Sequence, residues 1–366
     1  MRILQLIQKK QLRGAEVFAC QLSQELERNG HEIMLVALLD ANVELPYDGQ
    51  VHVIDANLSQ RFFDIKAWKK LAELIRLFDA DLVQANAADT LKYAVFSQLL
   101  FRWKAKIVFR NANKMGDFIR SSFTRLLNHF FLSRVQLVAS VSEECRIDFL
   151  QTFKLAKTPC LTLPIGINSS AVIGYPDLAA FGLPKDRPVF LSVAGFVPEK
   201  NHAGLIRIFQ QIHQQYPLAC LLLVGQGRLQ STIQRQVHAA GLTDVVFFAG
   251  SRTDVLQLMP CCTALLMPSL IEGLPAVILE AFKSKLPVVA YTVGGIPEVL
   301  TEETGWPIKK NDEAAFVRAA GKLLLADSTQ LSTKTNQAYD FVMKSYLNET
   351  IALKFIDAYH TIVHAG

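Results

Sequence analysis

The chain has little charge and few residues that break secondary structure. Charged side chains make up 19% of its 366 residues and hydrophobic ones 51%, with 19 glycines and 14 prolines. Disordered chains contain less hydrophobic surface, and collagen-like chains contain far more glycine and proline, so both classes are excluded. At about 100–200 residues per domain, this length predicts two domains, each with its own core.

Long hydrophobic runs and organised cysteines are also missing. No uninterrupted apolar run approaches the roughly 18 residues of a membrane helix. The short run Met1–Ile7 is followed by the polar segment Gln8–Lys10, which is unlike a signal peptide. The six cysteines, including adjacent Cys261 and Cys262, lack the spacing of a metal site or disulfide framework. These absences predict a cytoplasmic protein with free thiols.

Positive charge is concentrated in the first half of the chain. The net charge is +5, with 22 lysines and arginines against 17 acids in residues 1–166 and 16 against 16 afterwards. The excess peaks in Phe101–Arg134, which has eight basic residues, six phenylalanines and one acid, Asp117. This segment is either a solvated face over core aromatics or a contact with an anionic surface. No nucleic-acid partner is expected, because the excess is small and no recognised binding module is present.

Strand and helix patterns alternate along the whole chain. They begin again after a glycine- and proline-rich linker at Gly174–Pro184. Such alternation predicts parallel strands with crossover helices, so the fold class is α/β with two doubly wound, Rossmann-like sheets that face a cleft. Strands are predicted at 2–7, 32–39, 51–55, 81–85, 106–110, 136–141, 188–194, 219–224, 245–249, 264–267 and 288–291, and helices at 14–28, 64–78, 88–103, 117–133, 142–152, 201–215, 229–240, 276–284, 313–326 and 328–363.

The segment Ser269–Glu280 carries the strongest indication of function. Glu272 lies in a loop after a predicted strand, and Pro275 begins a helix, so backbone N–H groups there are free for hydroxyl or phosphate oxygens. Glu280 follows in an otherwise apolar helix, where a lone carboxylate needs water or a partner. An exposed helix charge is the alternative interpretation.

A second loop supplies a cation. Lys200, within Pro198–Asn201, lies near the predicted start of a helix, where a lysine can neutralise a phosphate. An ordinary surface lysine is the alternative. The glycine pair Gly225 and Gly227 suggests a dinucleotide fingerprint, but Gln230 stands where the third glycine belongs. An oxidoreductase is therefore disfavoured.

These residues resemble those of glycosyltransferase family 4, the retaining nucleotide-sugar glycosyltransferases of the two-domain GT-B fold. Glu272 and Glu280 match the Glu-x7-Glu motif of that family. The resemblance covers nearly the whole chain and is densest from about 188 to 308. Further matching segments are Gly14–Glu16, Ser140–Glu143, Pro198–Asn201, Val224–Gly227, Phe248–Arg252 and Val293–Glu298.

The resemblance implies a domain plan and a role for each matching residue. An acceptor-binding domain would span 1–170 and a donor-binding domain 171–345, and a helix at 346–366 would return to the first. Glu280 would hold the ribose hydroxyls, Glu272 would lie beside the donor sugar, and Lys200 would pair with the diphosphate, the last two being catalytic. The other implied donor contacts are Gly14, Gly195, Gly225, Arg252 near the base, and the backbone of Gly273, Leu274 and Pro275.

Two departures from the family pattern bear on the site. Gly195 stands where the family usually has an arginine that shares the diphosphate charge, and Arg13 is the predicted substitute cation. Asn86, together with Arg110 or Asn111, stands at first-domain strand ends where histidines are common, and these three are the predicted acceptor-binding residues. Without a histidine base, the leaving phosphate would itself take the acceptor proton.

The resemblance also implies the partners. The donor would be a UDP-, GDP- or ADP-sugar and the acceptor a glycan or lipid-linked molecule in bacterial surface polysaccharide or lipopolysaccharide synthesis, without metal or cofactor. Members with lipid-linked acceptors often dock on membranes, so 101–134 is a predicted peripheral contact at the inner membrane face. A catalytically weakened homologue that binds nucleotide-sugar or glycan is the alternative, favoured by Gly195 and Asn86 and opposed by Glu272 and Glu280.

Overall fold

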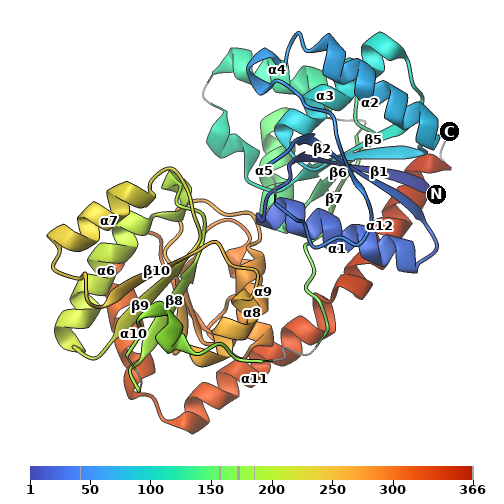
Figure 1. Cartoon of the computed structure of the whole chain (residues 1–366). Coiled ribbons are helices and arrows are strands. Elements are labelled where there is room, and N and C mark those ends of the chain that lie inside the picture. The colour runs from blue at the N-terminus through green and yellow to red at the C-terminus, as the bar shows by residue number, and fades with distance from the viewer. Residues whose placement is uncertain (42, 120, 156–157, 171–173, 185, 365–366) are drawn as a thin grey trace. The chain divides into compact units, whose positions relative to one another are not determined.

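The computed structural model describes residues 1–41, 43–119, 121–155, 158–170, 174–184 and 186–364, and it divides into two compact units. The first unit contains Met1–Asn168 together with Asn348–Gly366, and the second contains Ser169–Leu347. Each unit is an α/β structure with its own parallel sheet, as Figure 1 shows. The prediction of two doubly wound, Rossmann-like sheets is confirmed.

The described part of the first unit contains a seven-stranded sheet in the order β3-β2-β1-β4-β5-β6-β7, with every paired strand parallel. The direction of winding reverses beside β1, so the loops after β1 and β4 meet at the point where such sheets bind ligands. The strands are β1 (Arg2–Lys9), β2 (Glu32–Leu39), β3 (Val51–Val53), β4 (Leu82–Ala85), β5 (Lys106–Asn111), β6 (Leu137–Ser140) and β7 (Cys160–Thr162).

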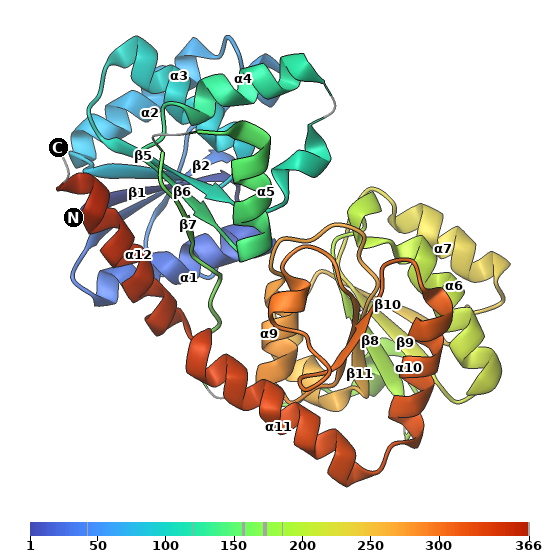
Figure 2. The same ribbon diagram turned by 180° about the vertical axis from the view of Figure 1, so that it is seen from behind.

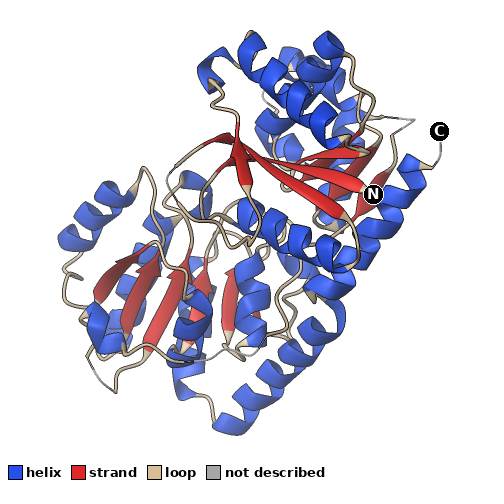
Figure 3. Cartoon of the chain, turned by 45° about the vertical axis from the view of Figure 1, so that its right-hand side comes forward, coloured by secondary structure: helices blue, strands red, loops and turns tan. Residues whose placement is uncertain are grey.

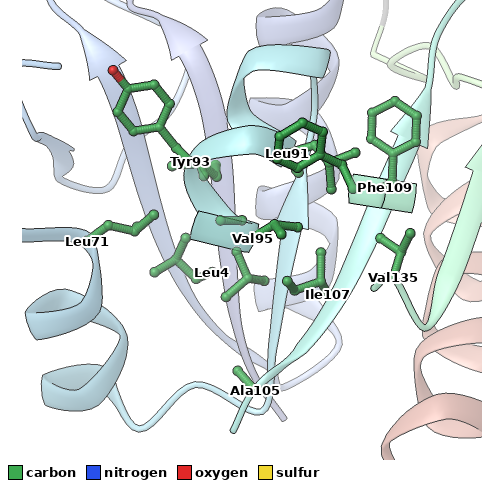
Figure 4. Packing of buried hydrophobic residues seen from close by; sticks show 14 of the residues in the cluster. Leu4, Leu71, Leu91, Tyr93, Val95, Ala105, Ile107, Phe109 and Val135 are labelled. Atoms are coloured by element: carbon green, nitrogen blue, oxygen red, sulfur yellow. The ribbon is translucent and has the colours of Figure 1, made fainter. Parts of the chain in front are cut away.

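Helices pack against this sheet and complete the first core, part of which is drawn in Figure 4. The core contains Leu4 from β1, Ile107 from β5 and Leu71 from a helix, all without exposed surface. Burial of this kind stabilises the unit by about 25 cal/mol per Å² of apolar surface. The helices are α1 (Gly14–Arg28), α2 (Ile65–Phe78), α3 (Ala88–Phe101), α4 (Ser122–Leu132), α5 (Glu143–Phe153) and α12 (Asn348–Val363).

The C-terminal helix α12 packs on α1, although more than 300 residues separate them in sequence (Figure 2). The rings of Phe18 and Phe355 lie 5.9 Å apart, and the Tyr359 hydroxyl donates to Gln84 Oε1 at 2.6 Å. Burial of Phe355 and Tyr359 therefore makes α12 part of the first core.

The described part of the second unit contains a six-stranded parallel sheet in the order β10-β9-β8-β11-β12-β13 (Figure 3). Its strand order repeats that of the first unit, with the reversal beside β8. The strands are β8 (Val189–Val193), β9 (Cys220–Val224), β10 (Val246–Gly250), β11 (Ala264–Met267), β12 (Val288–Tyr291) and β13 (Trp306–Ile308), and the helices α6 (His202–Gln215), α7 (Gln230–Ala239), α8 (Val255–Leu258), α9 (Ala276–Lys283), α10 (Glu313–Leu325) and α11 (Ser328–Ser345).

Three differences from the predicted elements have local causes. The expected helix 328–363 is two helices, because the Asn348 backbone N–H bonds to the Ile167 carbonyl at 2.9 Å instead of continuing a helical ladder. Strand β13 is missing from the prediction because it has only three residues and contains a proline. Helix α4 begins at Ser122 rather than 117, since the Ser121 side chain accepts from the Thr124 N–H and caps it.

Candidate active site

The two loops that sequence motifs single out lie side by side at one sheet edge. One follows β8 and the other follows β11, and these strands are paired neighbours. The Leu270 N–H donates to the Glu199 carbonyl at 2.8 Å, and Asn201 Nδ2 donates to the Pro268 carbonyl at 3.0 Å. Asn201 has the left-handed φ of 53° and its side chain also caps α6. These contacts hold the two loops in register.

The predicted catalytic pair, Lys200 and Glu272, is brought into direct contact. Lys200 Nζ lies 2.6 Å from each carboxylate oxygen of Glu272. The Glu272 side chain is 5% exposed and that of Lys200 27%, so one partner is enclosed and the other reaches solvent. A buried carboxylate at this depth needs a charged partner, because desolvation otherwise favours its neutral form. The pair places one positively charged and one negatively charged side chain at the carboxyl end of the sheet.

A third loop, after β12, packs against the backbone of Glu272 and Gly273. Gly294 has φ 54°, and a Cβ there would lie 1.9 Å from the Glu272 carbonyl oxygen. The Gly295 N–H donates to the Gly273 carbonyl at 2.6 Å. Position 294 therefore requires glycine, both for its conformation and for the close approach. The matching segment Val293–Glu298 thus supports the loop that carries Glu272.

Glu280 lies in the second turn of α9, whose neighbouring residues Leu279 and Ala281 are fully buried. The Glu280 carboxylate is partly buried, and within the described part of the chain it has no hydrogen bond or ion pair. Burial raises the pKa of Glu280 to about 7. Pro275 occupies the cap position before the helix rather than its first turn. An unpartnered carboxylate on an apolar helix is suited to accept hydroxyl donors from a ligand.

Two glycines of the neighbouring loops differ in whether a larger residue could take their place. Gly225 has φ 136°, and a Cβ there would lie 2.1 Å from the Ala194 carbonyl oxygen, so no other residue fits. At Gly195 a Cβ would meet only the Gln226 carbonyl oxygen, at an ordinary 3.6 Å. The loops after β8 and β9 are therefore in close contact at position 225, while position 195 has room for a side chain.

Arg252, predicted near the base, follows β10 and already has partners. Its guanidinium contacts Asp254 at 2.7 and 2.5 Å and lies 4.9 Å from the centre of the Phe181 ring. The hydrogen bond from Arg252 lowers the pKa of Asp254. The charge of Arg252 is therefore already paired within the second unit.

One residue near the site was not predicted. His202 is 3% exposed, and its ring stacks on Phe196 with the centroids 4.1 Å apart. Burial, reinforced by the charge of Lys200, lowers the pKa of His202 to about 4, so the ring is neutral. Among the described residues, its Nδ1 has no hydrogen-bond partner. Its place at the first position of α6, two residues after Lys200, was the available signal.

In the first unit, Arg13 and Gly14 form the start of α1. Arg13 is exposed in the cap position, and Gly14 is the first helical residue. A Cβ at Gly14 would meet no described atom within 4 Å, so the local structure does not demand glycine. In the same first turn, buried Glu16 accepts from Gln11 Nε2 at 3.0 Å, and burial raises the pKa of Glu16.

The predicted acceptor residues Asn86, Arg110 and Asn111 are all buried at the ends of β4 and β5. Asn86 Nδ2 donates to Gln5 Oε1 at 2.9 Å, and its Oδ1 accepts from Gln84 Nε2 at 3.0 Å. Asn111 Nδ2 donates to the Ser140 hydroxyl and the Cys145 carbonyl at 3.1 and 3.2 Å. These two amides are therefore held in networks within the unit.

Arg110 differs from its neighbours because two of its buried donors have no hydrogen-bond partner among the described residues. Its guanidinium lies 4.0 Å from the centre of the Phe18 ring, and its Nε and Nη1 have no partner among the residues described. Burial lowers the pKa of Arg110 to about 9. Arg110 is therefore a buried side chain with unused donors.

Family comparisons agree with this geometry. Residues 177–339 match the family model described as glycosyl transferases group 1, and residues 12–171 match that of glycosyltransferase family 4. The chain belongs to the family 4 type of GT-B glycosyltransferases. The two matches meet near the boundary between the units, so each unit corresponds to one half of the family fold.

Individual relatives in this family are named for different reactions. A GDP-mannose-dependent phosphatidylinositol monomannoside mannosyltransferase of Mycolicibacterium smegmatis is 34% identical over 44% of this chain and 46% of its own length, so the match spans about half of that relative. The N-acetyl-α-D-glucosaminyl L-malate synthase of Bacillus anthracis is 26% identical over 96% and 94%. An Anabaena protein, HepE, solved with UDP-glucose, is 19% identical with a TM-score of 0.82 over 99% and 100%, which shows the shared fold.

Neither a metal centre nor a membrane-spanning helix is found among the described residues. No group of three or more histidine, cysteine, aspartate or glutamate residues is arranged to hold a metal ion in the residues that the structure covers. Within the same ranges, every helix is too short or too polar to cross a bilayer.

Proposed function

We propose that this protein is a retaining glycosyltransferase that moves a sugar from a nucleoside-diphosphate sugar to a glycan or lipid-linked acceptor. The observation that carries the proposal is the joint placement of Lys200 and Glu272 at the edge where parallel sheets bind ligands. On the helix that follows, Glu280 presents a carboxylate without a partner in the described structure. A phosphate-neutralising cation and two hydroxyl-accepting carboxylates are the groups that a sugar nucleotide requires.

Each group has a role in the proposed reaction. Glu280 binds the ribose hydroxyls, and Lys200 exchanges part of its contact with Glu272 for the diphosphate. Glu272 then accepts from hydroxyls of the donor sugar, next to the backbone of Gly273 and Leu274. Fixed positive groups stabilise the charge of the departing diphosphate, which is the main contribution to catalysis in such sites. With Lys200 supplying that charge, the proposed reaction needs no metal.

Retention follows from a front-face reaction. The leaving phosphate oxygen takes the acceptor proton on the same side of the sugar, so no side-chain base is required. His202 takes no part in this proton transfer, because its neutral ring is buried against Phe196.

The proposed acceptor is lipid-linked or a growing surface glycan. The mannosyltransferase relative is named for a phosphatidylinositol mannoside acceptor. The proposed place of action is the cytoplasmic side of the membrane, with the segment 101–134 in peripheral contact. Exposed Phe118 and Phe123 in that segment support this location.

A nucleotide-sugar or glycan binding component is the second candidate. Gly195 lacks the arginine that would share the diphosphate charge, and Arg252 is already paired with Asp254. This candidate predicts binding without turnover.

Thermal unfolding with UDP, GDP, ADP and their sugars tests the proposal. A nucleotide at 100-fold its dissociation constant adds about 2.7 kcal/mol to the stability, and Glu280→Ala should abolish that shift. Asp340→Ala, which removes an exposed carboxylate on α11, is the matched control and should keep it. Release of nucleoside diphosphate in the presence of acceptor then separates the enzyme from the binding component. Stabilisation by no nucleotide would refute the enzyme and leave a glycan-binding component as the favoured candidate.

A further inference from the structure

Helix α4 leaves most of its apolar side uncovered. Only Phe131 and Leu132 at its C-terminal end are buried, where the Phe131 ring meets Phe96 of α3 at 5.1 Å. Phe123 is 74% exposed, Leu126 68% and Phe130 37%. Contiguous exposed apolar surface of this kind marks an interaction site.

These exposed side chains lie on one side of the helix. The spacing of Phe123, Leu126 and Phe130 is three and then four residues, which places them on a single stripe along α4. Phe118, in the turn that precedes α4, is a further exposed aromatic at 48%. The helix is thus amphipathic with its apolar stripe facing solvent.

A basic pocket adjoins the same stripe. Helices α4 and α5 pack against each other (Figure 2), and a pocket of about 390 Å³ lies between α4 and the C-terminal end of α5. Arg125 and His129 line it from α4, and Thr152 and Lys154 from the α5 side. Leu126 belongs to both the pocket wall and the stripe, so the polar and apolar surfaces are continuous.

Among the described residues, no acidic side chain pairs with the cations of this pocket. Within the described ranges, Arg125 and Lys154 form no ion pair. The three acidic residues of α5 are engaged elsewhere. Asp148 accepts from the Gly116 N–H at 2.9 Å, Glu144 pairs with Lys114 at 2.7 Å, and Glu143 pairs with Arg146 at 2.5 Å. The pocket therefore has an uncompensated positive charge.

We propose that the α4–α5 pocket binds the phosphate of an anionic phospholipid headgroup while the α4 stripe enters the bilayer interface. Amphipathic helices with aromatic and leucine residues on one side and cations beside them bind in this way. Anionic lipid attracts such cations, and the basic excess of the surrounding segment acts in the same direction. A water-soluble phosphate would account for the pocket and leave the stripe unexplained.

This inference deepens the peripheral membrane contact within the proposed function, and it names the lipid chemistry and the residues. It does not depend on the sugar-transfer step, because Arg125, Lys154 and the stripe are separate from the donor-binding residues of the second unit.

Sedimentation of the full chain with vesicles tests the proposal. Phosphatidylcholine vesicles containing phosphatidylglycerol should bind the protein, and pure phosphatidylcholine should bind it much less. The double variant Arg125→Gln/Lys154→Gln should weaken binding to the anionic vesicles, each lost cation costing about fivefold. Leu126→Ser should weaken binding to both kinds of vesicle.

Matched controls come from α12 of the same unit, where Lys354 and Leu353 are exposed. Lys354→Gln and Leu353→Ser should bind as the unchanged protein does. Equal binding to neutral and anionic vesicles would overturn the headgroup site, as would a double variant that matches Lys354→Gln. Inorganic phosphate that displaces the protein at millimolar concentration would identify a soluble ligand instead and also overturn it.

Thermal stabilisation by nucleotide, measured on the same protein variants, distinguishes a failure of the lipid proposal from a failure of the proposed function. Glu280→Ala should lose nucleotide stabilisation and still bind anionic vesicles. The Arg125→Gln/Lys154→Gln variant should show the reverse, and an unfolding transition that matches that of the unchanged protein would show that its first unit is folded.

Discussion

At the scale of single residues, glycines around the candidate site fall into two physical classes. Gly225 and Gly294 have positive φ, and a Cβ at either would collide with a backbone carbonyl. Gly195 has neither constraint. The first class shapes the loops, and the second removes a side chain that the family usually has. The family resemblance suggested all three positions, but only the tertiary structure separates the two classes.

Gly195→Arg should strengthen nucleotide binding. The position has room for a side chain, and a charge-assisted hydrogen bond to a diphosphate contributes about 1.5–3 kcal/mol, or roughly tenfold or more in affinity. Titration calorimetry with the nucleotide that stabilises the protein measures the change. Gly195→Ala, which adds a Cβ at the same position without charge, is the control and should leave the affinity near that of the unchanged protein. A gain shared by both variants, or by neither, would contradict the prediction.

Glu280 should make the stability depend on pH. The unfolded chain releases this proton near the ordinary value of 4.5, and the folded chain near 7, because burial disfavours the charge. Between these values the unfolded state binds fewer protons, so the contribution of Glu280 to stability falls as the pH rises, by at most about 1.4 kcal/mol per pH unit.

Glu280→Gln, which cannot ionise, should therefore gain stability relative to the unchanged protein as the pH rises from roughly 5 to 8. Urea unfolding at several pH values measures this difference. Asp340→Asn, at an exposed position, is the control and should show a constant difference. If the difference in unfolding free energy between Glu280→Gln and the unchanged protein did not vary with pH, the Glu280 carboxylate would be solvated or partnered.

At the scale of elements, periodicity predicted most helices and strands but not where they end. Residues 328–363 have one continuous helical pattern, and the break before Asn348 depends on a hydrogen bond to Ile167, far away in sequence. Strand β13 has three residues, too few for any period to show. The apolar stripe of α4 looked the same in sequence as a core stripe, because periodicity reveals that a helix is amphipathic but not what covers it.

Helix α12 should contribute to the stability of the first unit. Phe355 is fully buried against Phe18 of α1, so Phe355→Ala should reduce the free energy of unfolding by about 3–5 kcal/mol. Leu353→Ala, on the exposed side of the same helix, should change it by about 0.5 kcal/mol or less. Equilibrium urea unfolding compares the two. Equal effects would show that α12 is not packed on the core.

At the scale of the whole molecule, residues with a predicted role are divided between two units of the same topology. The second unit holds Lys200, Glu272 and Glu280, on loops and a helix at one edge of its sheet. The first holds Arg13 in the cap position of α1 and Arg110 at the end of β5. Their joint action across a cleft stays a prediction from the family resemblance.

Nucleotide binding should protect specific backbone amides of the full chain from hydrogen exchange. The proposed contacts lie in loops 194–201 and 268–275, so amides there and in 293–298 should exchange more slowly with bound nucleotide. Mass-spectrometric exchange measures this, and Glu280→Ala should abolish it. Amides of α4, outside the proposed donor contacts, are the internal reference. Protection confined to the first unit would contradict the donor assignment.

The sequence by itself determined the fold class, the two-domain plan and the loops that carry the candidate site, because these depend on local periodicity and on motifs of adjacent residues. Only the tertiary structure decided which groups are paired and which are not. It joined Lys200 to Glu272 across 72 positions, left Arg110 buried with unused donors, and exposed the stripe of α4. Charge pairing and burial depend on neighbours in space, and a chain's own order does not specify those neighbours until it folds.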